Sequence, residues 1–291
     1  MIIKAVGGIY YVDALSGVYS GEAVRCGARG IFRLDGISPS AGDRVRVEVS
    51  ENSEPVIAEI YPRKNYLVRP PLANLDGIVF VNSCTQPAPN RFILDKLVAI
   101  ADSKGIEPLI VFTKTDLEDA GELSDIYRGI GIGVCTVNSL TGEGVDEVMD
   151  FINGKTTAFI GNSGLGKSSL LNALFPELSL ETAHISKKLG RGRHTTRQVE
   201  MYKLAGGYVA DTPGFSTVDT ERYCRIPKGE LDNSFREFAP YTDKCRFADC
   251  SHIKETGCAV RAAAESGEIA SSRYDSYIRM YEEASRKNDW E

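Results

Sequence analysis

A single glycine-rich run limits the possible folds of this chain more than any other feature: Gly161-Asn162-Ser163-Gly164-Leu165-Gly166-Lys167-Ser168. It matches the pattern G-x-x-x-x-G-K-[ST], it follows an apolar stretch at 158–160, and a helical sequence begins at Ser169. Such a loop presents backbone N–H groups to phosphate oxygens, while Lys167 adds a positive charge and the Ser168 hydroxyl is a ligand for Mg²⁺. The run therefore predicts an α/β domain that binds a nucleotide.

Alternating strands and helices between residues 67 and 224 support this prediction. Continuous apolar runs, which are typical of strands buried on both faces, occur at 78–81 and 109–112, and we expect further buried strands at 133–137, 158–160 and 208–210. Helical patterns lie at 91–104 and after Gly144 and Gly166. Strands that alternate with helices predict a mostly parallel sheet.

Asp211-Thr212-Pro213-Gly214 follows the last of these apolar runs. A carboxylate at a strand end, after a phosphate loop in the sequence, is where the second protein contact of the metal usually lies. Gly214 lets the backbone approach the γ-phosphate, because glycine has no side chain. The motif therefore predicts the metal side of a triphosphate site.

The choice of base depends on Thr113-Lys114-Thr115-Asp116, which ends a predicted buried strand. A carboxylate accepts hydrogen bonds from both N1–H and N2–H₂ of guanine, whereas adenine offers no such pair. Asn138-Ser139-Leu140 closes the next strand and suits a loop whose backbone N–H contacts the base oxygen. We therefore expect guanine specificity, and Asp116 disfavours the reading as an ATP-dependent enzyme.

The order of these motifs is unusual, because the base-reading elements precede the phosphate loop in the sequence. In most GTPases they follow it. The same sheet still assembles if the chain is circularly permuted, since the termini of a domain often lie close together. We therefore expect a permuted domain at 67–224, with a further domain following Asp211 closely.

The two flanking regions differ from the centre and from each other. Residues 1–66 contain short strands and many glycines, which predicts a small all-β barrel. Residues 225–291 are polar and contain Cys245, Cys250, His252 and Cys258. Three thiols and one imidazole form a tetrahedral zinc set with no open position, hence a structural site. The alternative is a cluster of reduced core cysteines.

Charge narrows the possible partners. The chain has 34 Lys and Arg against 40 Asp and Glu, a net charge of −6, which argues against indiscriminate binding of polyanions. The segment 187–197 is nevertheless basic and glycine-rich. Its cations either contact RNA phosphates or stay solvated, and Thr195 or Thr196 is positioned in the sequence to complete the Mg²⁺ shell. The N-terminal residues lack a long apolar segment and include Asp13, so we expect no signal peptide and a cytoplasmic protein.

Together these features resemble the ribosome small-subunit-dependent GTPase A family of the RsgA/YjeQ type. The resemblance covers nearly the whole chain and depends on the permuted order, the zinc set and four short runs: GNSGLGKSS at 161–169, GRGRHTT at 190–196, DTPGF at 211–215 and GCAV at 257–260. It implies an N-terminal OB-fold barrel, an α/β circularly permuted P-loop GTPase domain and a C-terminal, mainly helical zinc-binding domain. It also implies late maturation of the small (30S) ribosomal subunit, which binds the protein through its rRNA and stimulates hydrolysis of GTP.

The resemblance assigns roles to residues of this chain. It implies that Ser168 and Thr196 bind Mg²⁺ and that His194 is the candidate catalytic group, since the apolar Phe215 stands where many GTPases have a water-orienting Gln. The residues expected to bind GTP are Thr113, Lys114, Thr115, Asp116, Asn138, Ser139, Gly161, Asn162, Ser163, Gly164, Leu165, Gly166, Lys167, Ser168, Ser169, Asp211 and Gly214.

Two departures from the usual pattern accompany these roles. Thr113 replaces an Asn whose amide braces the base loop against the phosphate loop, so we expect that brace to be lost. Asn138-Ser139 replaces the more usual Ser-Ala. We expect a monomer without a membrane partner. The alternative function is a non-catalytic, RNA-binding assembly factor that uses bound nucleotide as a conformational clamp.

Overall fold

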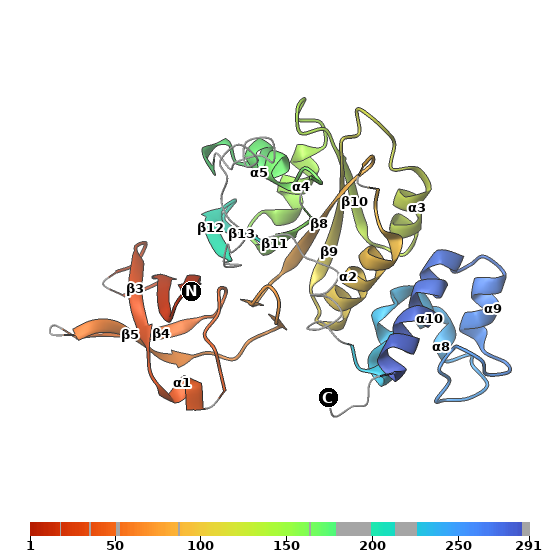
Figure 1. Ribbon diagram of the computed structural model, residues 1–291, viewed down its shortest axis with the longest axis horizontal. Helices are drawn as coiled ribbons and strands as arrows, with labels where there is room; N and C mark the ends of the chain where they lie inside the picture. The colour runs from red at the N-terminus through yellow and green to blue at the C-terminus, as the bar shows by residue number, and fades with distance from the viewer. Residues whose placement is uncertain are drawn as a thin grey trace.

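The computed structural model describes residues 1–17, 19–34, 36–50, 53–86, 88–162, 164–178, 199–212 and 226–286. Their elements form an N-terminal barrel, a central sheet with helices on both faces, and a C-terminal helical unit (Figure 1). The barrel and the helical unit lie on opposite sides of the central sheet in Figure 1.

The apolar runs predicted as buried strands form the central sheet. Its parallel strands are β8 (Gly77–Ser83), β9 (Glu107–Thr113), β10 (Gly133–Val137), β11 (Thr156–Ile160) and β13 (Gly207–Asp211). Strand β12 (Glu200–Leu204) pairs with β13 in the antiparallel direction. The strand order is β10-β9-β8-β11-β13-β12, so the expected mostly parallel sheet is confirmed.

Helices cover both faces of this sheet, which explains why its strands read as continuous apolar runs. On one face, α2 (Arg91–Ser103) and α3 (Gly121–Gly129) share a buried cluster with Phe80 and Phe112. On the other, α4 (Val145–Ile152) and α5 (Lys167–Leu174) pack around Val79 and Phe159. A 3₁₀ turn, η1 (Pro176–Leu178), follows α5. Alternate side chains of each strand thus pack into two separate hydrophobic cores, one on each face of the sheet.

The topology is that of a permuted domain. Strand β11 lies between β8 and β13 and is parallel to both. The strands β8, β9 and β10, which precede it in the sequence, lie on one side of it, and β13 and β12, which follow it, lie on the other. Because parallel strands end at the same edge of a sheet, the predicted phosphate and base motifs meet along one edge.

The N-terminal unit is a small Greek-key barrel. Its elements are β1 (Ile2–Val6), β2 (Ile9–Asp13), β3 (Ala23–Ala28), α1 (Ile31–Leu34), β4 (Val45–Ser50) and β5 (Ser53–Ile60). The strand order is β1-β2-β3-β5-β4, with β3 and β5 parallel, and backbone bonds of Ile2 to Gly42 and Asp43 bring the ends together. This arrangement confirms the expected OB-fold barrel.

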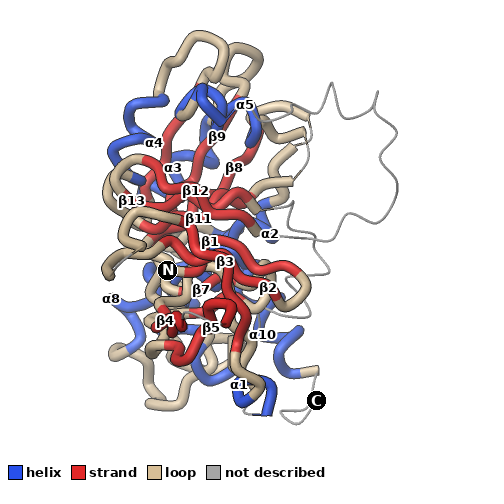
Figure 2. Tube along the Cα trace, turned by 90° about the vertical axis from the view of Figure 1, so that its left-hand side faces the viewer, coloured by secondary structure: helices blue, strands red, loops and turns tan. Residues whose placement is uncertain are grey.

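The barrel is joined to the central sheet by strand pairing. The strands of the barrel adjoin those of the central sheet (Figure 2). Strand β1 pairs with β12 in the antiparallel direction, with Lys4 opposite Glu200. Asp13 of the barrel accepts hydrogen bonds from Tyr208 and Lys203. A short hairpin, β6 (Tyr66–Leu67) and β7 (Leu72–Ala73), connects the two units in the sequence. The barrel strands therefore continue the central sheet beyond β12.

The C-terminal unit contains the 3₁₀ turns η2 (Lys228–Glu230), η3 (Asp232–Ser234) and η4 (Arg236–Phe238), and the helices α8 (Ala239–Thr242), α9 (Ala259–Glu265) and α10 (Ser271–Ser285). Tyr277 of α10 is buried, and Tyr274, Ile278 and Tyr281 pack against the same core. These side chains, which recur along one face of α10, are thus core packing. Helix α10 lies along α2 of the central unit (Figure 1).

A buried ionic network fixes α10 on α2. The side chain of Arg273 is 1% exposed, and it donates to Asp95 Oδ1 at 2.9 Å and to Glu237 Oε1 at 2.7 Å. Asp95 also accepts hydrogen bonds from Tyr127 at 2.7 Å and Ser276 at 2.6 Å. Burial, together with the neighbouring Asp95 carboxylate, raises the pKa of Tyr127 above its usual range. A buried charge is tolerated here because every partner is hydrogen-bonded.

We predict that Arg273→Met lowers the melting temperature, because it leaves two buried carboxylates without a cation. Removing one partner from a buried ion pair costs about 3–5 kcal/mol. The control is Arg286→Met, since Arg286 is exposed and pairs with Glu282 at 3.4 Å. Calorimetry of both variants is the measurement, and equal losses of stability would contradict the role assigned to the buried network.

Candidate nucleotide-binding and metal sites

The phosphate loop is packed tightly against its two neighbouring strands. It leaves β11 at Ile160 and enters α5 at Lys167, with Gly166 at a φ of +87°. A Cβ atom at Gly161 would lie 2.9 Å from the carbonyl oxygen of Val81, and one at Gly166 would lie 3.0 Å from Oγ1 of Thr113. Close approach favours glycine at both positions, and at Gly166 the positive φ is a second reason.

Thr113 braces the phosphate loop. Its Oγ1 is 2.6 Å from the carbonyl oxygen of Leu165, and 3.0 Å from that of Asn82. The expected loss of a brace at this position is therefore wrong: the hydroxyl group reaches the loop because Gly166 lets the backbone lie directly against it. The last residue of β9 is thus tied to the loop that follows β11.

Lys167 and Asp211 meet at this edge of the sheet, as their motifs predict. Lys167 Nζ forms an ion pair with Asp211 Oδ1 and donates to the carbonyl oxygen of Thr212 at 2.6 Å. Thr212 Oγ1 in turn donates to the carbonyl oxygen of Phe159 at 2.7 Å. The end of β13 is thereby held beside the phosphate loop.

This arrangement fits Mg²⁺. A carboxylate and a hydroxyl are hard oxygen ligands of the kind that Mg²⁺ prefers. Asp211 lies within ion-pair distance of Lys167, the residue next to Ser168 in the first turn of α5. The two oxygen donors therefore belong to one small region, and Mg²⁺ bound there would neutralise charge on the phosphates.

The base-reading loops follow the adjacent strands β9 and β10. Lys114 has a φ of +61° and donates to the carbonyl oxygen of Gln86 at 3.0 Å, while Asp116 is exposed. Asn138 Oδ1 accepts from Leu140 N at 3.0 Å and from Thr141 N at 3.4 Å, so its side chain shapes the second loop. The two loops therefore lie next to each other at the edge that carries the phosphate loop.

Several predicted site residues lie outside the described part of the chain. They are Ser163, His194, Thr195, Thr196, Gly214 and Phe215. Their roles in phosphate binding, Mg²⁺ binding and catalysis stay predictions.

The cysteine and histidine cluster has the dimensions of a zinc site. One ligand atom from each of Cys245, Cys250, His252 and Cys258 lies within 4.8 Å of the others. His252 Nδ1 is 3.6 Å from Sγ of Cys245 and 3.5 Å from Sγ of Cys258. With ordinary Zn–S and Zn–N bond lengths, the S-to-N edge of a tetrahedron is about 3.6 Å. The donor set therefore fits a closed, structural zinc ion.

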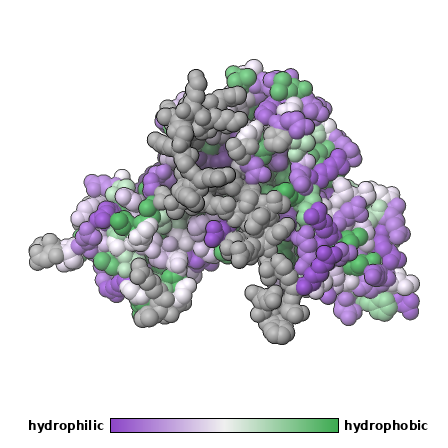
Figure 3. All heavy atoms as spheres, in the orientation of Figure 1, coloured by the Kyte–Doolittle hydropathy of each residue, from purple (hydrophilic) through white to green (hydrophobic). Residues whose placement is uncertain are grey.

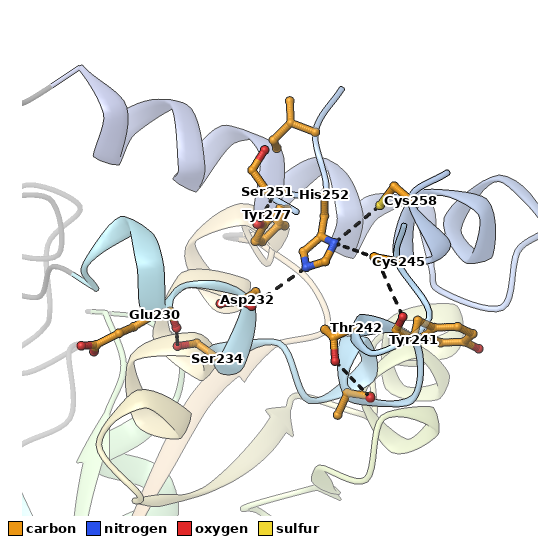
Figure 4. Close-up of polar contacts among 12 residues, drawn as sticks. Glu230, Asp232, Ser234, Tyr241, Thr242, Cys245, Ser251, His252, Cys258 and Tyr277 are labelled. Atoms are coloured by element: carbon orange, nitrogen blue, oxygen red, sulfur yellow. Dashed lines mark hydrogen bonds and ion pairs between the residues drawn. The ribbon is translucent and has the colours of Figure 1, made fainter. Parts of the chain in front are cut away.

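Groups around the cluster orient His252 (Figure 4). Its Nε2 is 4.0 Å from Asp232 Oδ2, and its carbonyl oxygen accepts from Tyr274 at 2.7 Å. Burial lowers the pKa of His252, which favours the neutral imidazole that a metal requires. At 4.0 Å the Asp232 carboxylate is an electrostatic neighbour of the ring rather than a hydrogen-bond acceptor, and it faces the ring nitrogen opposite the one that the thiols surround. Asp232 precedes the run of cysteine and histidine ligands in the sequence, and no motif predicts it.

Glu255 organises the loop between the ligands. Its carboxylate accepts hydrogen bonds from the backbone N–H of Ser251, Ile253 and Lys254, and from the Ser251 hydroxyl at 2.5 Å. These bonds stabilise the charged form and lower the pKa of Glu255 to about 2. Cys258 caps α9 by accepting from Arg261 N at 3.3 Å. The loop is thus held in shape by bonds other than those to a metal.

None of the helices within the described residues combines the length and the apolar character needed to cross a membrane. The face drawn in Figure 3 carries hydrophilic residues over all three units, with scattered hydrophobic patches between them.

Comparison with known proteins agrees with this architecture. Residues 60–221 match the model of the RsgA GTPase family, and residues 1–57 match that of the RsgA N-terminal domain. Two curated relatives carry the name small ribosomal subunit biogenesis GTPase RsgA. The one from Caldanaerobacter subterraneus subsp. tengcongensis is 42% identical over 98% of this chain and 95% of its own length. The one from Geobacillus thermodenitrificans is 44% identical over 97% of this chain and 96% of its own length.

Two solved structures are similar over almost the whole chain. YjeQ from Thermotoga maritima has a TM-score of 0.80 and 33% identity, covering 99% of this chain and 98% of its own. YloQ, described as a circularly permuted GTPase, has a TM-score of 0.77 and 35% identity, covering 99% and 96%. The predicted fold class, with its permuted central domain, is confirmed. The chain belongs to the RsgA GTPase family.

Proposed function

We propose that this protein hydrolyses GTP and acts in the late maturation of the small ribosomal subunit. The observation that carries the proposal is the convergence of the phosphate loop, Asp211 and the two base-reading loops on one edge of the sheet. The ion pair between Lys167 and Asp211 is the clearest sign of it. Relatives named for small-subunit biogenesis support the choice of partner.

The proposal assigns roles to the three parts of the chain. Residues 1–66 form an RNA-binding barrel, 67–224 the GTPase domain and 225–291 a zinc-binding domain. The partners are GTP, GDP and the small subunit with its rRNA, and the protein acts as a cytoplasmic monomer. In the GTPase domain, Lys114 lies along the base plane and Asp116 accepts from guanine.

Hydrolysis transfers the γ-phosphoryl group to water, and positioning and charge stabilisation do most of the catalysis. The backbone of 161–166 and Lys167 hold the phosphates, while Ser168, Thr196 and Asp211 hold Mg²⁺, which neutralises their charge. Phe215 offers no hydrogen bond to the attacking water, so His194 is the proposed water-orienting group. The alternative of a non-catalytic nucleotide clamp is not favoured, because the matching family model and the named relatives are GTPases.

We predict that Asp116→Asn weakens GTP binding and shifts preference toward xanthine nucleotides. The carboxylate accepts two guanine donors, whereas an amide also donates to the carbonyl at C2 of xanthine. Loss of a charge-assisted hydrogen bond costs about 1.5–3 kcal/mol, or roughly 10- to 150-fold in affinity. Titration with fluorescent GDP and XDP is the measurement. Unchanged GDP affinity without XDP binding would reject the assignment of the base.

Zinc is expected at close to one ion per chain. Cys250→Ser removes one ligand, so it should lower the melting temperature of the C-terminal unit and release zinc, while GDP binding stays near that of the wild type. The control is Cys26→Ser, because Cys26 is buried in the distant barrel. Metal analysis and calorimetry test both variants, and a wild-type protein purified without any zinc would refute the site.

We expect slow GTP hydrolysis by the protein alone and faster hydrolysis on the small subunit. The cations at 187–197 provide contacts for rRNA phosphates, and His194→Ala should reduce the stimulated turnover of GTP much more than it reduces binding of GTP or of the small subunit.

Arg191→Ala should instead weaken docking on the small subunit in a salt-dependent way. Single-turnover hydrolysis is measured with saturating small subunits, large subunits or neither. Equal rates in all three would reject a ribosome-triggered GTPase, and a fully active His194→Ala would reject only that residue's role.

A further inference from the structure

A row of paired residues crosses the sheet from the phosphate-loop strand to the barrel. Phe159 of β11 is opposite Asp211 of β13, Asp211 is opposite Glu200 of β12, and Glu200 is opposite Lys4 of β1. Side chains directly opposite each other in an antiparallel pair lie on the same face. The carboxylates of Asp211 and Glu200 are therefore neighbours, on the face that α5 covers.

Each of these two carboxylates has a lysine from a different part of the molecule. Asp211 pairs with Lys167 of the phosphate loop, and Glu200 pairs with Lys4 of the barrel at 3.0 Å. Tyr202 lies close to both carboxylates: burial raises its pKa, and the charges of Glu200 and Asp211 raise it further. Like charges opposite each other in a sheet are destabilising, and each lysine offsets one of the two negative charges.

Nucleotide binding changes this balance of charge, if the proposed function is right. Lys167 would then bind the phosphates, and the Asp211 carboxylate, released from this ion pair, would be available to hold Mg²⁺. Glu200, directly opposite Asp211, is a second negative charge on that face and would attract the metal. Lys4 opposes this attraction because it neutralises Glu200. The charge that Mg²⁺ meets therefore depends on a residue of the barrel.

We propose that Glu200 and Lys4 are positioning residues that set the Mg²⁺ affinity of the nucleotide site, with opposite signs. Glu200 strengthens metal binding at Asp211, and Lys4 restrains it. Since coupling between two binding events is reciprocal, Mg²⁺ bound at Asp211 also weakens the hold of Glu200 on Lys4. The contact between the barrel and the sheet thereby responds to the state of the nucleotide site.

The test is a Mg²⁺ titration of the full chain with fluorescent GDP, in which nucleotide dissociation is followed at each metal concentration. Lys4→Met should lower the Mg²⁺ concentration at which half of the GDP stays bound, and Glu200→Gln should raise that concentration. Exposed ion pairs contribute below about 1 kcal/mol, so each shift should be about two- to fivefold. In the double variant and in Lys4→Arg, this Mg²⁺ concentration should be close to the wild-type value. The affinity for GDP without metal should change little in any of the variants.

The matched controls are Lys155→Met and Glu107→Gln. These residues pair at 2.8 Å, and they lie at the amino ends of β11 and β9, away from the phosphate loop. The same loss of charge there should leave the Mg²⁺ curve unchanged. Melting temperatures within a few degrees of the wild type show that each variant is folded.

The possible outcomes distinguish failure of the proposed function from failure of the inference about Lys4 and Glu200. If the wild-type protein does not bind GDP, the proposed function fails and this inference fails with it. The wild-type protein could instead bind GDP normally while the Mg²⁺ titration curves of Lys4→Met and Glu200→Gln coincide with the wild-type curve or shift in the same direction. That result would overturn this inference alone. If Lys155→Met and Glu107→Gln shift the Mg²⁺ curve as much as the variants of Lys4 and Glu200 do, the effect comes from net charge. That result would reject a specific role for the Lys4–Glu200 pair.

Discussion

Strand β11 holds the permuted domain together. It is hydrogen-bonded to β8 on one side and to β13 on the other, although those strands lie at opposite ends of the domain's sequence. The loop that follows it packs between Val81 and Thr113, where the close approach at Gly161 and Gly166 and the positive φ of Gly166 favour glycine. The other parts of the nucleotide site follow neighbouring strands of the same sheet: the base-reading loops follow β9 and β10, and Asp211 ends β13.

Local patterns predicted the fold class correctly, and they placed the phosphate loop, Lys167 and Asp211 at one edge of the sheet, where the structure has them. Apolar runs located the strands of the central sheet, because helices on both faces bury most of the strand side chains. The spacing from Gly161 to Ser168 predicted a strand, a turn and a helix, all of which the structure contains. The cysteine spacing was equally informative, since ligands on one short loop are brought together by local structure.

The remaining features depend on contacts between distant residues, and sequence patterns do not encode these. Arg273 and Asp95 are 178 positions apart, and Lys4 and Glu200 are 196 apart. Each is an ordinary charged residue in its own segment and acquires a partner only when the units pack. Thr113 was misjudged for a related reason: its motif position was known, but the close approach of Leu165 was not.

The pairing of β1 with β12 has a consequence for solubility. Without the barrel, β12 would be the last strand of the central sheet, and its free N–H and C=O groups would be open to another chain. Isolated central domains would then tend to associate edge to edge and to aggregate as their concentration rises. The N-terminal barrel thus protects the sheet that it extends, in addition to any contact it makes with RNA.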